Sequence, residues 1–93
     1  MRRSLFVVAL LVLAGCGRKA TRDDCDVIVD RNVEVQLRAQ GTLDPATIAK
    51  RKDEMRSDMK DRIDQCVGKR VTDAMMTCVK GAETADQIDK CLR

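Results

Sequence analysis

The sequence contains no histidine, tryptophan or tyrosine, and its single aromatic residue is Phe6. Without imidazole it lacks the commonest general base and the commonest metal ligand. Without exposed rings it cannot stack on nucleic-acid bases. An enzyme built on this chain would have to use cysteine, aspartate, glutamate or lysine alone. We therefore expect no catalytic activity, no cofactor and no nucleic-acid partner.

Long hydrophobic runs are also scarce, and the one that stands out is short. Residues 5–14 carry no charge and follow a basic start that contains Arg2 and Arg3. A membrane-spanning helix needs about 20 apolar residues, so this run is too short to cross a bilayer. A basic head followed by a short apolar core is typical of a secretory signal peptide. A buried N-terminal helix is the less favoured interpretation.

The residues after this run are more specific. The motif Leu13-Ala14-Gly15-Cys16 resembles the lipobox of bacterial lipoproteins at every position. The resemblance implies that a signal peptide of residues 1–15 is cleaved before Cys16, whose thiol carries diacylglycerol and whose new amine is usually acylated, for example with palmitate. Two or three such chains hold a protein firmly on a bilayer. Because Gly17 rather than aspartate follows, resemblance to the enterobacterial sorting rule favours the outer membrane.

The rest of the chain is small, and it balances its charges. Loss of residues 1–15 would remove Arg2 and Arg3, which leaves acidic and basic side chains nearly equal in number. With 44% hydrophobic and 35% charged residues in the whole chain, the composition suits a short helical domain. A core without aromatic rings buries little area, so such a domain needs additional stabilisation.

Cysteines can supply that stabilisation. After Cys16, four remain, and an even number in a short exported chain predicts two disulfides, at Cys25, Cys66, Cys78 and Cys91. Each would add about 2–4 kcal/mol. In an antiparallel helical hairpin Cys25 lies near Cys66, which favours the pairs Cys25–Cys66 and Cys78–Cys91. The other two connectivities stay open.

Metal binding is the alternative use of these side chains. Zinc sites and redox motifs usually contain two cysteines separated by two residues, and no such pair exists here. Thioethers bind copper(I), but methionine at helical spacing more often fills a core. The methionines concerned are Met55, Met59, Met75 and Met76. We therefore expect no metal site and keep copper or zinc as a minor alternative.

Carboxylates cluster in two places, where they could in principle act as acids, bases or cation ligands. The two sets are Asp23, Asp24 and Asp26, and Asp53, Glu54 and Asp58. Both are interleaved with basic residues and lack the glycine turn of a calcium loop. We interpret them as solvated helix surface.

Two long helices are expected. Residues 22–40 show an i+4 apolar row as well as a strand-like alternation, and their length and the following Gly41 favour a helix. Asp44-Pro45 predicts the start of a helix that runs to about Cys66. Opposite charges four residues apart should stabilise it, as in Lys50/Glu54, Asp58/Arg62 and Lys60/Asp64.

Two short helices should follow. Thr72 can cap residues 73–80, which Gly81 ends, and Thr84 with Gln87 can form a capping box for residues 85–92. The expected fold is an all-α, disulfide-stapled array of about four helices, two long and two short. It would occupy residues 22–93, with residues 16–21 as the lipidated cysteine and a short tether. The short hairpin should fold across the open end of the long one.

These features predict an exported, lipid-anchored envelope protein without catalytic activity. It would be held on the membrane through Cys16, with the outer membrane favoured, and would bind another envelope protein or have a structural role. The charged faces of the 45–66 helix would supply the contact surface. The alternative is a secreted inhibitor or immunity lipoprotein that acts on a hydrolase or toxin. The sequence does not identify the partner.

Overall fold

The computed structural model describes residues 17–93, and over these residues the chain is almost entirely helical. The elements are β1 (Arg18–Lys19), α2 (Arg22–Ala39), α3 (Pro45–Asp58), α4 (Lys60–Cys66), β2 (Arg70–Val71), α5 (Asp73–Gly81) and α6 (Ala85–Cys91). The predicted all-α, disulfide-stapled array is therefore confirmed, with five helices over the described range instead of about four.

The helix ends follow from local capping. At the start of α2, Thr21 accepts a hydrogen bond from the Asp24 amide while the Asp24 carboxylate accepts one from the Thr21 amide. Asp44 caps α3 by accepting hydrogen bonds from both the amide and the hydroxyl of Thr47. Such caps satisfy amides that have no partner within the helix. Between the two helices Gly41 has a φ of 86°, the left-handed conformation that ends helices readily.

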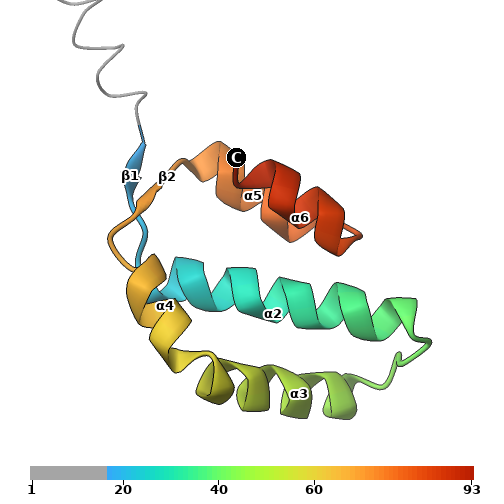
Figure 1. The fold of residues 1–93 in the computed structure, drawn as a ribbon. Coiled ribbons are helices and arrows are strands. Elements are labelled where there is room, and N and C mark those ends of the chain that lie inside the picture. The colour runs from blue at the N-terminus through green and yellow to red at the C-terminus, as the bar shows by residue number, and fades with distance from the viewer. Residues whose placement is uncertain (1–16) are drawn as a thin grey trace, which may run out of the picture.

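Helix α2 is the centre of the molecule. As Figure 1 shows, α3 runs antiparallel along one side of α2, and the α5–α6 hairpin lies along the other side. The short hairpin thus packs beside the long one. The prediction that it folds across the open end of the long hairpin is wrong. Because α2 is covered on two sides, it buries apolar residues on two faces.

The core consists of two clusters, one formed by α2 with α4 and the β1–β2 ladder and the other by α2 with the α5–α6 hairpin. The first gathers Ala20, Cys25, Val29, Ile63 and Val71, with Met55, Met59 and Cys66 packed against it. The second gathers Val35, Val79, Ala82 and Ile88, with Ile28, Cys91 and Leu92 packed against it. A disulfide accompanies each cluster, so each small core is reinforced by a covalent link.

The long second helix is interrupted, which corrects the prediction of one helix over residues 45–66. It divides at Met59, whose φ of −102° and ψ of 20° lie outside the helical range. The half-buried Met59 packs on the first core, and α4 turns away from the line of α3 (Figure 1). This turn brings Ile63 into the first core and Cys66 into contact with Cys25.

The ion pairs along α3 and α4 also differ from those expected at four-residue spacing. Glu54 pairs with Arg51, three residues away, and Asp64 pairs with Arg22 of α2. Within residues 17–93, Lys50, Asp58, Lys60 and Arg62 make no ion pair. These four side chains are exposed.

The segment expected to be a tether is instead ordered against the domain. Residues 18–19 form β1, which pairs antiparallel with β2 so that Arg18 lies opposite Val71 and Lys19 opposite Arg70. The following Ala20 is 3% exposed, and its amide donates to the Lys69 carbonyl at 2.7 Å. The folded body therefore includes residues that precede the predicted boundary at residue 22.

The two short helices form nearly as predicted. The Thr72 hydroxyl accepts from the Met75 amide and the Thr84 hydroxyl accepts from the Gln87 amide. The Gln87 side chain, however, accepts from the amide of Glu83 and not from that of Thr84, so the expected capping box is only half formed.

Candidate functional site

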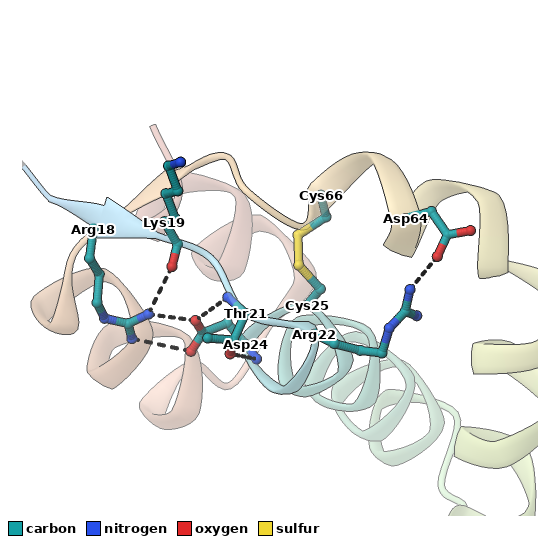
Figure 2. Close-up of a disulfide and its surroundings, with 8 residues drawn as sticks. All are labelled: Arg18, Lys19, Thr21, Arg22, Asp24, Cys25, Asp64 and Cys66. Carbon is teal, nitrogen blue, oxygen red and sulfur yellow. Dashed lines mark hydrogen bonds and ion pairs between the residues drawn. A yellow bond between two sulfur atoms is a disulfide. The ribbon is translucent and has the colours of Figure 1, made fainter.

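The end of the domain where α2 begins has the densest set of side-chain interactions. Figure 2 shows the Cys25–Cys66 disulfide there, which joins the first turns of α2 to the end of α4. Cys25 is 1% exposed, and the disulfide is flanked by the Arg22–Asp64 ion pair. The other disulfide joins Cys78 to Cys91 in the α5–α6 hairpin. The structure thus contains the pairing that the hairpin argument favours.

Arg18 ties the first strand to two helices. Its guanidinium donates to the Asp24 carboxylate at 2.6 Å and 3.2 Å (Figure 2). It also donates to Asp73 at the start of α5 at 2.9 Å. These hydrogen bonds raise the pKa of Arg18. They also hold the pKa of Asp24 far below its usual range, helped by the hydrogen bond from the Thr21 amide. Asp24 is therefore a structural carboxylate that is fixed in its ionised form.

This ionised state gives a testable pH dependence. A carboxylate whose pKa is lower in the folded state stabilises the fold above its ordinary pKa of 3.8, and that stabilisation disappears as the pH falls through the folded value. The wild-type protein should lose stability between about pH 5 and pH 2, and Asp24→Asn should flatten this part of the curve. Urea unfolding across the pH series measures it. Asp23→Asn, which changes an exposed carboxylate on the same turn, should keep the wild-type slope.

Gly17 fixes where the chain enters the domain. Its φ is 97°, a value that other residues rarely adopt. A Cβ at this position would lie 2.9 Å from the Val71 carbonyl oxygen, closer than real contacts allow. The residue that immediately follows Cys16 is therefore packed directly on β2. No local sequence pattern indicates this role, because the glycine contacts a residue more than fifty positions away.

A second charged cluster links α2 to its neighbours. Glu34 pairs with Arg31 at 3.3 Å, Arg38 at 2.6 Å and Lys52 of α3 at 3.4 Å. Burial raises the pKa of Glu34, but these cations outweigh that effect and lower it overall. Arg31 also donates to the Ala82 carbonyl at 2.7 Å, just past the end of α5. The cluster therefore ties both neighbours of α2 to it.

Asp30 is the exception within that region. Its Oδ1 is buried without a hydrogen-bond partner, while its Oδ2 lies 3.4 Å from Arg56 of α3. Burial raises the pKa of Asp30, and Arg56 and Lys52 oppose that shift. A single carboxylate with one orphaned oxygen makes neither a metal site nor an acid–base pair.

The cysteines and methionines considered for metal binding have structural roles in the fold. All four cysteines after Cys16 are in disulfides, and residues 17–93 hold no group of three or more cysteine, aspartate or glutamate side chains placed to bind a metal. Met55 and Met59 line a groove of about 310 Å³ between α2 and α3. Met75 accepts a hydrogen bond from the Thr72 amide at 3.4 Å, and Met76 is buried.

The carboxylate sets are likewise part of the structural framework. Asp24 is bound by Arg18 and Thr21, Asp53 pairs with Arg56, and Glu54 pairs with Arg51. The remaining members are Asp23 and Asp58, which are exposed, and Asp26, which is half-buried.

The outward side of α3 and α4 carries the charged surface that the sequence predicts as the contact region. Its exposed charged residues without an ion-pair partner in the described part of the chain are Lys50, Asp58, Lys60, Asp61 and Arg62. Only Ile48 and Ile63 of these two helices are fully buried. This surface can therefore exchange water for a partner without breaking internal contacts.

The lipobox and Cys16 lie outside the described residues. Among the helices of residues 17–93, none combines the length and apolar character needed to cross a bilayer. In comparisons with known proteins, no family model, no curated protein and no solved structure matched the chain significantly.

Proposed function

We propose that this protein is a lipid-anchored component of a bacterial envelope that binds another envelope protein and carries out no catalysis. The observation that carries the proposal is the cysteine placed directly after the apolar run of residues 5–14, in the sequence Leu13-Ala14-Gly15-Cys16. The fold supports it in two ways. Two disulfides suit an oxidising compartment outside the cytoplasm, and the chain is packed on the domain from Gly17 onward.

The proposed contact surface is the outward side of α3 and α4. Its three cations Lys50, Lys60 and Arg62 form no ion pair within residues 17–93 and outnumber the two unpaired carboxylates there, Asp58 and Asp61. These cations are therefore available to an acidic surface on a partner. Charge complementarity of this kind steers association and selects partners. Three other basic residues of α3, by contrast, are already engaged in internal ion pairs, namely Arg51, Lys52 and Arg56.

Charge reversal on this surface tests the proposal. The double variant Lys50→Glu/Arg62→Glu should lower the amount of partner crosslinked to the protein in intact cells by about tenfold, because like charges would then face each other. The readout is the crosslinked species per molecule of protein recovered from the membrane fraction. Lys90→Glu/Arg93→Glu makes the same change in charge on the C-terminal segment and should leave crosslinking unchanged. It also breaks two exposed ion pairs, with Asp86 and Asp89, which contribute only a few tenths of a kcal/mol each.

Two results would change the proposed contact surface or the proposed function. If Lys50→Glu/Arg62→Glu retained every crosslinked partner of the wild type, the contact surface would be wrong. If the partner were a single hydrolase or toxin bound tightly in a one-to-one complex, the inhibitor or immunity function would replace the structural one. Thermal unfolding of both double variants shows that the fold is intact, since surface substitutions change stability by only about 0.5 kcal/mol.

A further inference from the structure

The β1–β2 ladder brings together basic residues that are about fifty positions apart in the sequence. Lys19 lies directly opposite Arg70, and Lys69 precedes Arg70 at the same end of the ladder. Side chains of directly opposed residues in an antiparallel pair lie on the same face. All three side chains are exposed.

The two faces of this ladder have different electrostatic environments. Neighbouring residues of a strand point to opposite faces, and Figure 2 shows the Lys19 ammonium directed away from Arg18 and Asp24. On its own face, Arg18 is neutralised by Asp24 and Asp73. Within residues 17–93, Lys19, Lys69 and Arg70 form no ion pair. The positive charges of Lys19 and Arg70 are therefore left uncompensated on the opposite face, and the exposed Lys69 adds a third at the adjoining end of the ladder.

The position of the chain start gives this face a function. Resting on the proposed lipidation of Cys16, we propose that Lys19, Lys69 and Arg70 form a membrane-facing basic ladder that binds the phosphates of anionic lipid headgroups and fixes the orientation of the domain on the bilayer. Lys19 is three residues from Cys16, and three residues span at most about 11 Å. Arg70 lies about 5 Å beyond Lys19 across the ladder.

These distances are short enough for the attraction to act. Exposed charges interact over a Debye length of about 8 Å at physiological ionic strength, and a basic residue near an anionic surface gains roughly 1 kcal/mol. Because Gly17 is packed on Val71, there is no free segment after Cys16 to carry the domain away from the surface. Val67, a hydrophobic residue that is 40% exposed in the turn before Lys69, can reach the headgroup layer beside the cations.

The orientation follows from the fold. In Figure 1 the ladder and the α2–α3 turn lie at opposite ends of α2. The 18 residues of α2 span about 27 Å. With the ladder on headgroups, the far turn, which includes the 71% exposed Leu43, is held away from the anchor point. The outward side of α3 and α4 then has a fixed direction toward its partner.

Lysine footprinting of the lipidated protein tests this inference. The purified full-length mature protein is placed in vesicles of phosphatidylcholine alone, or with about one third phosphatidylglycerol, and its lysines are acetylated and quantified by mass spectrometry. Lys19 and Lys69 should react on the order of fivefold more slowly on the anionic vesicles, and high salt should abolish the difference. Lys50 and Lys60 on the outward side of α3 and α4 serve as internal controls and should react equally on both.

Arg70→Glu supplies the matching variant, since it leaves both reporter lysines in place. It should remove most of the protection of Lys19 and Lys69, whereas Arg62→Glu, the same substitution on exposed α4, should preserve it. Equal labelling of Lys19 and Lys69 on the two kinds of vesicle would overturn the inference. The intact mass of the same sample reports whether Cys16 is acylated. Acylated protein with unprotected lysines overturns the ladder alone, and protein without acyl chains overturns the anchor together with it.

Discussion

Replacing Cys25 and Cys66 together with alanine is expected to lower the free energy of unfolding by about 4 kcal/mol or more. The disulfide closes a loop with a sequence separation of 41, and longer loops restrict the unfolded chain more strongly. Cys25 is also 1% exposed in the first core, so its removal leaves a cavity as well. Urea unfolding, followed by circular dichroism, measures the loss. For a domain of this size such a loss should largely abolish folding at physiological temperature.

The second disulfide provides the matched control. Cys78 and Cys91 are separated by only 13 positions, and Cys78 is exposed, so Cys78→Ala/Cys91→Ala should cost about 3 kcal/mol and leave the α2–α3 hairpin folded. Because the first disulfide joins α2 to α4, its loss should affect the whole molecule. A larger loss of stability from the Cys78/Cys91 variant than from the Cys25/Cys66 variant would contradict this ranking.

Ile88→Ala should have the second-largest effect, a loss of about 3 kcal/mol. Ile88 is 2% exposed and is the one fully buried residue of α6, where it packs in the second core with Val35 and Val79. Its truncation removes apolar contact that the small core cannot replace by collapsing, because the Cys78–Cys91 disulfide holds the hairpin in position. Urea unfolding gives the magnitude, and amide hydrogen exchange should show faster opening in α5 and α6.

Leu43→Ala is the control for that substitution. It deletes a side chain of the same size, but Leu43 is 71% exposed in the α2–α3 turn and should change stability by less than about 0.5 kcal/mol. If Ile88→Ala destabilised the protein no more than Leu43→Ala does, the second core would not be a source of stability.

The mixed periodicity of residues 22–40 has a physical explanation in the fold. Val33 and Val35 are both buried, as in a strand, yet they lie in the regular helix α2. Two residues along a helix differ by about 200° in direction, so they point to nearly opposite sides. Helix α2 needs both because α3 covers one side and the α5–α6 hairpin covers the other. The sequence showed the helix but not the number of its neighbours.

The break at Met59 was beyond local prediction for a related reason. No glycine or proline occurs between Pro45 and Cys66, and the apolar spacing continues across the break. The turn depends on distant groups, because Ile63 must reach the first core and Cys66 must reach Cys25. Capping was predictable, in contrast, since Asp44 and Thr72 act on residues only three positions away.

The candidate site shows the same difference between local patterns, which the sequence reveals, and long-range contacts, which it does not. Cysteine positions along the helices favoured the disulfide pairing found in the structure, because an antiparallel hairpin places its two open ends side by side. The ladder formed by Lys19 and Arg70 could not be foreseen, since neither two-residue strand has a periodic pattern. The same holds for Arg18, whose two carboxylate partners are 6 and 55 positions away.

The most direct test of the account is the intact mass of the protein extracted from membranes, measured before and after reduction and alkylation. The account predicts a chain that begins at Cys16, carries the mass of two or three acyl chains, and gains alkyl groups on Cys25, Cys66, Cys78 and Cys91 only after reduction. A chain that retains residues 1–15, or that carries no acyl mass and has four free thiols, would contradict the proposed anchor and the disulfide-stabilised fold together.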